Sequence, residues 1–170
     1  GMAHECGVST VVHIGALLDA IPHTRDVMLT GSSNDFKFKQ TLESYDIRPS
    51  RYQGPTGITS AVMEACTKHY ITYATLWGHT PHYLQAAPNY LVGQALIKTL
   101  AHLVNIKVDM EDLKAAAGTY LREVSVAVDG DAQISAYVGK LEERYDHNDG
   151  DLEEMPEPGE VVRDLENFLK

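Results

Sequence analysis

The segment Leu76–Tyr83, with the sequence LWGHTPHY, constrains the fold of this chain more than any other stretch. It continues the apolar run Ile71–Leu76 and closes that run with a Gly, two His and a Pro. Such a run is typical of a buried strand, and the residues that follow indicate that its carboxyl end opens into a shaped loop. In open α/β sheets, ligands usually bind at that edge. The segment therefore predicts an α/β sheet with a candidate site at one strand end.

Two further runs in the first half of the chain predict strands. Val8–Leu17 is apolar and β-branched, which is typical of a strand covered on both faces. Asp26–Thr30 predicts a second, shorter strand. Before the third strand, Ile71–Trp77, an i, i+3, i+4 apolar pattern over residues 58–66 predicts a helix, and a weaker helical pattern spans Asn34–Tyr45. The order strand, helix, strand favours a βαβ crossover and a parallel sheet.

The second half of the chain predicts helices and no strand. Apolar stripes with helical spacing run from Leu91 to Val104, from Leu113 to Val128 and from Ile134 to Tyr145. Residues 146–160 hold seven acidic side chains and no Lys or Arg, which is typical of a solvated linker. We expect one domain overall, made of an α/β core (1–104), a helical extension packed on it (105–145), an acidic linker (146–160) and a terminal helix (161–170).

The small number of predicted strands has consequences for association. Sheets in globular proteins average about five or six strands, so three leave the sheet short. Either the pattern misses strands, or the chain is part of a larger fold, or partner chains cover the open edge. Because an uncovered edge strand invites pairing with another chain, we expect a homo-oligomer, and a different protein partner also fits such an edge.

Composition argues against several classes of function. The chain of 170 residues has a formal net charge of −10, whereas nucleic-acid surfaces need clustered Lys and Arg. No apolar run approaches the roughly 20 residues that span a bilayer. The two Cys, Cys6 and Cys66, lie far apart without metal or redox spacing. We therefore expect no nucleic-acid or membrane partner, and a cytoplasmic protein with free thiols.

Three polar loops are candidates for a ligand site. The first follows the first strand and contains an Arg, whose planar fork suits phosphate or carboxylate. The second opens the helix before the third strand, where free backbone N–H groups attract anions. The third follows the third strand and carries two His. In a parallel sheet all three would meet at one edge and form a polar pocket. The candidate substrate-binding residues are His23, Arg25, Thr56, Gly57, His79 and His82.

Each candidate also has a structural interpretation that the sequence leaves open. Arg25 could pair with a local carboxylate such as Asp19 or Asp26. Thr56 could cap its own helix. The two imidazoles of the third loop could satisfy backbone groups near the strand end.

A metal site at His79 and His82 is the least supported alternative. Pro81 pushes Thr80 toward extended geometry, which disfavours a helical His pair, and no Cys, Asp or Glu lies close enough in sequence to complete a ligand set. The chain also lacks a P-loop, a dinucleotide fingerprint and a GxSxG elbow. We assign no catalytic residue, no metal and no cofactor; the sequence leaves enzymatic activity open and favours its absence.

Several motifs, taken together and in order, resemble a known family. They are Gly7–Leu17 with Pro22-His23-Thr24-Arg25, Ser50–Ile58, Leu76–Tyr83, Ala87-Pro88-Asn89 and Leu141–Asp146. As a set they resemble the proteasome assembly chaperone 2 family, in its bacterial, mainly actinobacterial branch. Each motif alone is weak, but their order and spacing run through nearly the whole chain.

This resemblance implies a three-layer α/β/α fold similar to nucleoside phosphorylases, followed by a helical extension. It implies no established enzymatic activity, since the eukaryotic relatives assist proteasome assembly through protein–protein contacts. Family members of this type carry further strands before the position of Gly7, whereas Met2–Glu5 looks like the end of a helix. We therefore expect the chain to correspond to the C-terminal portion of the domain and to lack N-terminal strands.

Two functions from different classes follow. The first is a non-enzymatic, assembly-chaperone-like or scaffold protein that acts through protein–protein contacts. The alternative is a binding protein or enzyme of nucleoside phosphorylase-like fold that takes a ribosyl, phosphate or other anionic small molecule.

Overall fold

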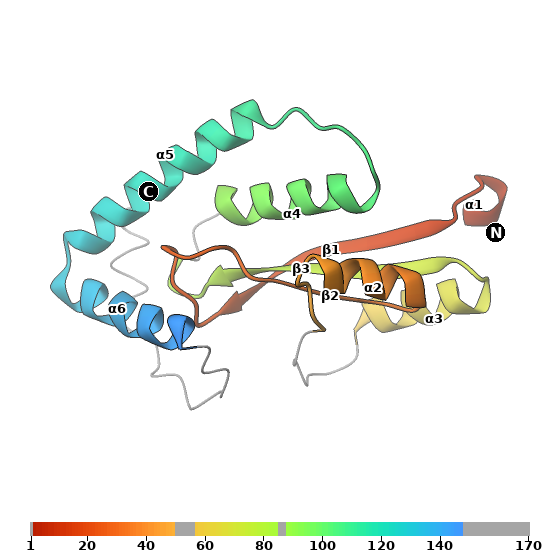
Figure 1. Cartoon of the computed structure of the whole chain (residues 1–170), viewed down its shortest axis with the longest axis horizontal. Helices are drawn as coiled ribbons and strands as arrows, with labels where there is room; N and C mark the ends of the chain where they lie inside the picture. Colours follow the sequence, from red (N-terminus) through yellow and green to blue (C-terminus); the bar gives the residue numbers. More distant parts are fainter. Residues whose placement is uncertain (1, 50–56, 85–87, 148–170) are drawn as a thin grey trace.

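The computed structural model describes residues 2–49, 57–84 and 88–147. These residues form three strands and six helices (Figure 1). In chain order they are α1 (Met2–Glu5), β1 (Thr10–Asp19), β2 (Leu29–Ser33), α2 (Phe36–Ser44), α3 (Ile58–Lys68), β3 (Thr72–Pro81), α4 (Tyr90–Leu103), α5 (Glu111–Asp129) and α6 (Ala132–Asp146). None of the helices within these ranges is long and apolar enough to cross a membrane.

The sheet is mixed and has the strand order β1-β3-β2. β1 runs parallel to β3, with Thr10 opposite Thr72 and Asp19 opposite Pro81. β2 runs antiparallel to β3, so the prediction of a parallel sheet was wrong for this strand. The reason is that two helices, α2 and α3, separate β2 from β3. Each helix runs along the sheet once (Figure 1), so the chain enters β3 in the direction opposite to β2.

Helices cover both faces of the sheet and make three layers. Leu42 of α2 and Val92 of α4 share a buried cluster with Leu76 of β3. Cys66 of α3 packs instead against Tyr73 of β3. Because successive strand residues point to opposite faces, Leu76 and Tyr73 place α2 and α4 on one face and α3 on the other. The predicted three-layer α/β/α fold is therefore confirmed.

The strands end later than the sequence patterns predicted. β2 continues to Ser33 instead of stopping at Thr30, and β3 continues to Pro81 instead of stopping at Trp77. Most of the segment Leu76–Tyr83 is therefore strand. Its backbone pairs with β1 as far as Pro81 and with β2 as far as Gly78. The loop that the sequence placed at Gly78 begins only after Pro81.

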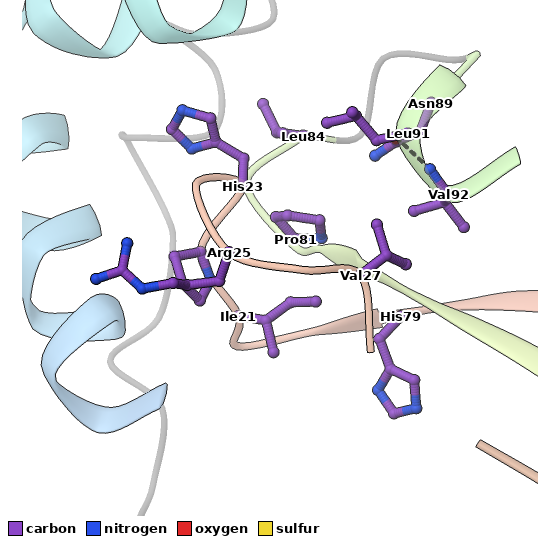
Figure 2. Close-up of a pocket in the computed structure, with 11 residues that line it drawn as sticks. Ile21, His23, Arg25, Val27, His79, Pro81, Leu84, Asn89, Leu91 and Val92 are labelled. Carbon is purple, nitrogen blue, oxygen red and sulfur yellow. Dashed lines mark hydrogen bonds between the residues drawn. The ribbon is translucent and has the colours of Figure 1, made fainter. Parts of the chain in front are cut away.

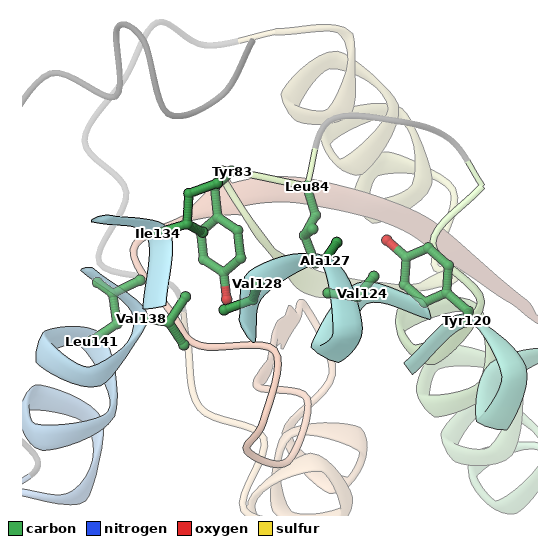
Figure 3. Packing of buried hydrophobic residues seen from close by; sticks show 9 residues of the cluster. All are labelled: Tyr83, Leu84, Tyr120, Val124, Ala127, Val128, Ile134, Val138 and Leu141. Atoms are coloured by element: carbon green, nitrogen blue, oxygen red, sulfur yellow. The ribbon is translucent and has the colours of Figure 1, made fainter. Parts of the chain in front are cut away.

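The second half is helical, as predicted, and it extends the molecule beyond the carboxyl ends of β1 and β3 (Figure 1). A buried cluster joins the end of β3 to α5 and α6 (Figure 3). Its members are Tyr83, Leu84, Tyr120, Val124, Ala127, Val128, Ile134, Val138 and Leu141. The acidic segment was predicted to start at Asp146, which is the last residue of α6. The rest of that segment and the terminal helix lie outside the described residues.

Candidate functional site at the carboxyl ends of β1 and β3

Two of the three predicted loops meet at one edge of the sheet. His23 and Arg25 lie in the loop after β1, and His79 lies near the end of β3. These three residues line one cavity together with apolar side chains that include Val27 and Val92 (Figure 2). The cavity has a volume of ≈ 10 Å³, about the space that one water molecule needs.

The remaining candidate residues lie elsewhere or beside this cavity. His82 is buried in the turn after β3. Gly57 is the N-cap residue of α3 and does not line the cavity. Thr56 lies outside the described residues. The expected convergence of three loops therefore holds for two of them, since Gly57 at the start of α3 does not join the cavity.

His79 is held between an acid and a hydroxyl. Its Nδ1 lies 2.5 Å from Asp19 Oδ2, and its Nε2 lies 3.0 Å from Thr30 Oγ1. Burial raises the pKa of Asp19, but hydrogen bonds from His79 and from the Ala20 amide outweigh burial and hold the pKa below its usual value. The carboxylate therefore stays ionised and orients the imidazole.

This Asp–His–Thr arrangement has the connectivity of a catalytic triad, but it lacks a free oxyanion donor and an accessible hydroxyl. A nucleophile of that kind uses the amide of the following residue as an oxyanion donor. Here the amide after Thr30, that of Gly31, donates to the carbonyl of Arg48. Thr30 is itself buried on β2. The arrangement fixes the end of β3 to β1 and β2, and its geometry does not support acyl transfer.

His82 connects the sheet to the helical extension, and His23 binds the turn after β3. His82 contacts the Asp19 carbonyl through Nδ1 at 3.0 Å and the Tyr137 hydroxyl of α6 through Nε2 at 2.8 Å. The hydroxyl of Tyr83 accepts a hydrogen bond from the His23 amide at 2.8 Å and lies 2.9 Å from its Nδ1. Burial lowers the pKa of His23, and the carboxylates of Glu142 and Asp129 offset this only in part.

Arg25 is the ionic link to α6. Its guanidinium points away from the cavity toward that helix (Figure 2) and donates to both carboxylate oxygens of Asp146, at 2.8 and 2.7 Å. It also contacts Glu142 at 3.1 Å. The hydrogen bond with Asp146 raises the pKa of Arg25 and lowers the pKa of that carboxyl group. The expected carboxylate pair exists, but its partners come from α6 and not from Asp19 or Asp26.

The sequence patterns missed the partners of the candidate residues. Tyr83, Tyr137 and Glu142 were assigned only to helical stripes or to the family resemblance, because their pairing partners lie 55 to 118 residues away. One signal was present. The motif Leu141–Asp146 occurs in the same set as Pro22-His23-Thr24-Arg25, and the structure shows that these two motifs bind one another.

We expect the protein to lose stability as the pH falls below about 6.5, in part through His23. The pKa of this residue in the folded protein lies below its ordinary value of 6.5. The contribution of neutral His23 to stability is therefore complete above pH 6.5. It is lost as the pH falls below this value, because the unfolded chain binds the proton more readily than the folded chain. Urea unfolding between about pH 5 and pH 7.5 measures the effect.

The variant His23→Asn is the control for this prediction. It keeps a polar group near the Tyr83 hydroxyl but cannot titrate, so its unfolding free energy should depend less on pH over the same range. An equal pH dependence in the variant and the original chain would show that His23 does not contribute.

A second feature of this structure is an apolar surface on β1, on the side where no strand pairs within residues 2–49, 57–84 and 88–147. Odd-numbered residues of β1 turn their backbone groups toward β3, as shown by the Asp19 carbonyl, which accepts from the His82 amide. The even-numbered residues therefore turn theirs outward. Ile14 and Leu18 are also 42% and 55% exposed, and Ala16 between them is exposed. We call Ile14, Ala16, Leu18 and their outward backbone edge the β1 surface.

Comparison with known proteins supports one family. A family model described as the PAC2 family matches residues 1–128. A solved PAC2 family protein from Streptomyces avermitilis is 34% identical, with a TM-score of 0.69, over 81% of this chain and 56% of its own. The search of curated proteins found no match.

Two Mycobacterium tuberculosis structures are also similar. Rv2125, described as a proteasome-assembly chaperone homologue, is 31% identical with a TM-score of 0.69, over 81% of this chain and 57% of its own. Rv2714, a protein of unknown function, is 25% identical with a TM-score of 0.78, over 86% of this chain and 49% of its own. The present chain therefore spans about half the length of each of these solved chains.

Proposed function

The chain belongs to the PAC2 family, and from this premise we propose that it is a non-enzymatic, assembly-chaperone-like protein that acts through protein–protein contacts. The likeness to the proteasome-assembly chaperone homologue Rv2125 supports this proposal. We place this activity in the cytoplasm, where the free thiols of Cys6 and Cys66 are expected to stay reduced.

The family match over residues 1–128 is the observation that carries this proposal. The β1 surface agrees with it, because exposed apolar side chains favour docking of another polypeptide. The polar residues near the carboxyl edge of the sheet also favour protein–protein contacts over a small-molecule site. His79, His82, His23 and Arg25 have partners inside the chain, so they stabilise the fold as it stands.

A small anionic ligand is the second candidate. It is favoured by the position of His23, Arg25 and His79 around one cavity. A ligand there would have to displace Asp146 and Glu142 from Arg25 and to open a cavity that has space for about one water molecule. Thermal stabilisation by phosphate or a ribose phosphate would favour this candidate over the first.

We expect the purified chain to form a complex with proteasome subunits of the α or β type from the same organism. The measurement is native mass spectrometry of the mixed proteins at micromolar concentration, together with the rate at which the subunits assemble. Because the chain carries a net charge of −10, an unrelated protein of similar size and charge is the control for non-specific attraction. A complex should also survive raised salt, since apolar and backbone contacts are screened little.

The proposal would be abandoned if no complex formed with either type of subunit and the assembly rate did not change.

A further inference from the structure

The face of α4 that meets α5 is covered at its start and exposed further along. The ring centroid of Tyr90, at the start of α4, lies 6.0 Å from that of Tyr120 on α5. Ile97 and Val104 lie about two and four turns beyond Tyr90, so they continue the same face. In Figure 1, α5 begins above the middle of α4, and only the connection between the helices passes over the second half of α4. Ile97 and Val104 are therefore left 39% and 40% exposed.

The connection between α4 and α5 extends this apolar surface. The Ile106 amide donates to the Ala101 carbonyl at 2.9 Å, which folds the connection back onto the end of α4. Ile106 and Val108 are 53% and 43% exposed. We call Ile97, Val104, Ile106 and Val108 the α4 surface. It lies on elements that are consecutive in this chain and shares no residue with the β1 surface. Exposed apolar side chains that gather in this way favour contact with another polypeptide segment.

The α4 surface lies in a part of the chain that holds no acidic side chain. Residues 65–108 contain no Asp or Glu, although the whole chain has a formal net charge of −10. Lys98 and Lys107 flank the apolar residues, and neither forms an ion pair within the part of the chain that the structure describes. Acidic side chains return only at residues 109–112, where the positive end of the α5 dipole favours them. The surface therefore suits a segment that is both apolar and acidic.

The C-terminal segment of this chain has both properties. Residues 148–170 hold eight Asp or Glu and two Lys or Arg, which gives a formal charge of −6. Residues 161–170 carry apolar side chains at the spacing of one helical face. These are Val161, Val162, Leu165, Phe168 and Leu169. A helix of this length is marginal in water unless it packs against another element, so it needs an apolar surface to dock on.

The acidic linker is long enough to bring this segment to the α4 surface. α6 ends at Asp146, and residues 148–160 lie between its end and Val161. These thirteen residues span up to about 45 Å when extended, whereas a compact domain of about 150 residues has a radius of gyration of about 15 Å. The linker can therefore cross the domain. Because both partners belong to one molecule, their effective concentration is high, and a weak contact is enough for docking.

We propose that the C-terminal segment docks on the α4 surface of its own chain. The apolar face of residues 161–169 packs against the α4 surface, and the carboxylates of the segment lie near Lys98 and Lys107. The proposal goes beyond the proposed function and is independent of it, since it uses neither the β1 surface nor a proteasome subunit.

The first test is carbodiimide cross-linking of the full chain at low micromolar concentration, followed by protease digestion and mass spectrometry. This reagent joins a Lys amine to a carboxylate where the two are in contact. Lys98 or Lys107 should be joined to acidic residues between 149 and 166, in molecules with the mass of one chain. Lys68 is the control. It is 70% exposed at the end of α3, on the opposite face of the sheet, and it should not be joined to that segment.

The second test is amide hydrogen exchange of residues 161–169 in the full chain and in two variants. Burial of one Leu or Phe side chain is enough to slow exchange about tenfold, so the original chain should show at least this protection relative to a synthetic peptide of the same sequence. Ile97→Glu places a carboxylate in the α4 surface and should remove the protection. Ile58→Glu makes the same change at a residue that is 79% exposed on α3, and it should keep the protection. Circular dichroism should show both variants folded, since both positions are exposed.

The proposal would be overturned if these cross-links were absent, if they joined two chains instead of one, or if residues 161–169 exchanged as fast in the original chain as in the peptide. Protection that survived Ile97→Glu would also contradict it, because the segment would then dock elsewhere. None of these readouts involves proteasome subunits, so they leave the proposed function to its own test.

Discussion

Gly78→Val should destabilise the protein by about 3 kcal/mol, the upper end of the cost of overfilling a core. Gly78 lies on β3 under α4, and a Cβ atom there would be 2.5 Å from Val92 Cγ1 and 3.2 Å from Leu96 Cδ1. Val92 is β-branched and stiff in a helix, so it cannot turn aside, and α4 must move away from the sheet. Chemical denaturation monitored through Trp77, the single Trp, measures the loss.

The matched control is Gly93→Ala on α4 itself. A Cβ atom at Gly93 meets nothing within 4 Å, and Ala favours a helix over Gly by about 1 kcal/mol. This variant should therefore be as stable as the original chain or more stable. If the free energy of unfolding of Gly78→Val lay within about 0.5 kcal/mol of that of the original chain, α4 would not contact β3 as closely as described.

Tyr83→Ala should have the largest effect on the docking of the helical extension, with a loss of about 3–5 kcal/mol. Tyr83 is fully buried, and its ring makes edge contacts with His23, His82 and Tyr137. Removing the ring leaves a large cavity between the sheet and α6 (Figure 3). Denaturant unfolding measures the loss, and amide hydrogen exchange in α6 should become faster than in α4.

Two further variants separate packing from hydrogen bonding at this position. Tyr83→Phe keeps the ring but leaves the buried His23 amide without its acceptor, and it should cost about 1–3 kcal/mol. Tyr70→Ala is the control for the substitution itself, because Tyr70 is 98% exposed, and it should have little effect. Equal losses in Tyr83→Phe and Tyr83→Ala would show that the ring packing contributes nothing.

Much of the fold could be predicted because it depends on local patterns. The helices α4, α5 and α6 follow apolar stripes with helical spacing, and β1 and β3 follow β-branched runs. The direction of β2 could not be predicted in this way. It depends on how many times the chain runs along the sheet between two strands, and the weak helical pattern that became α2 was not counted as such a pass.

The candidate site was predicted as a set of residues but not as a set of contacts. His23, Arg25 and His79 do meet at one edge, because the carboxyl ends of parallel strands lie together. Their partners Tyr83 and Glu142 come from later turns and helices. No local pattern contains such pairs, since they form only when the loop after β1 packs against the turn after β3 and against α6.

The sequence by itself determined the α/β class, the helical second half, the residues at the strand ends and the resemblance to a family. Only the tertiary structure decided that Arg25 binds α6, that His79 lies between Asp19 and Thr30 and that β2 runs antiparallel to β3. The physical reason is that apolar periodicity sets which face of each element is buried. The partner of a polar group and the neighbour of a strand depend instead on which distant elements pack side by side.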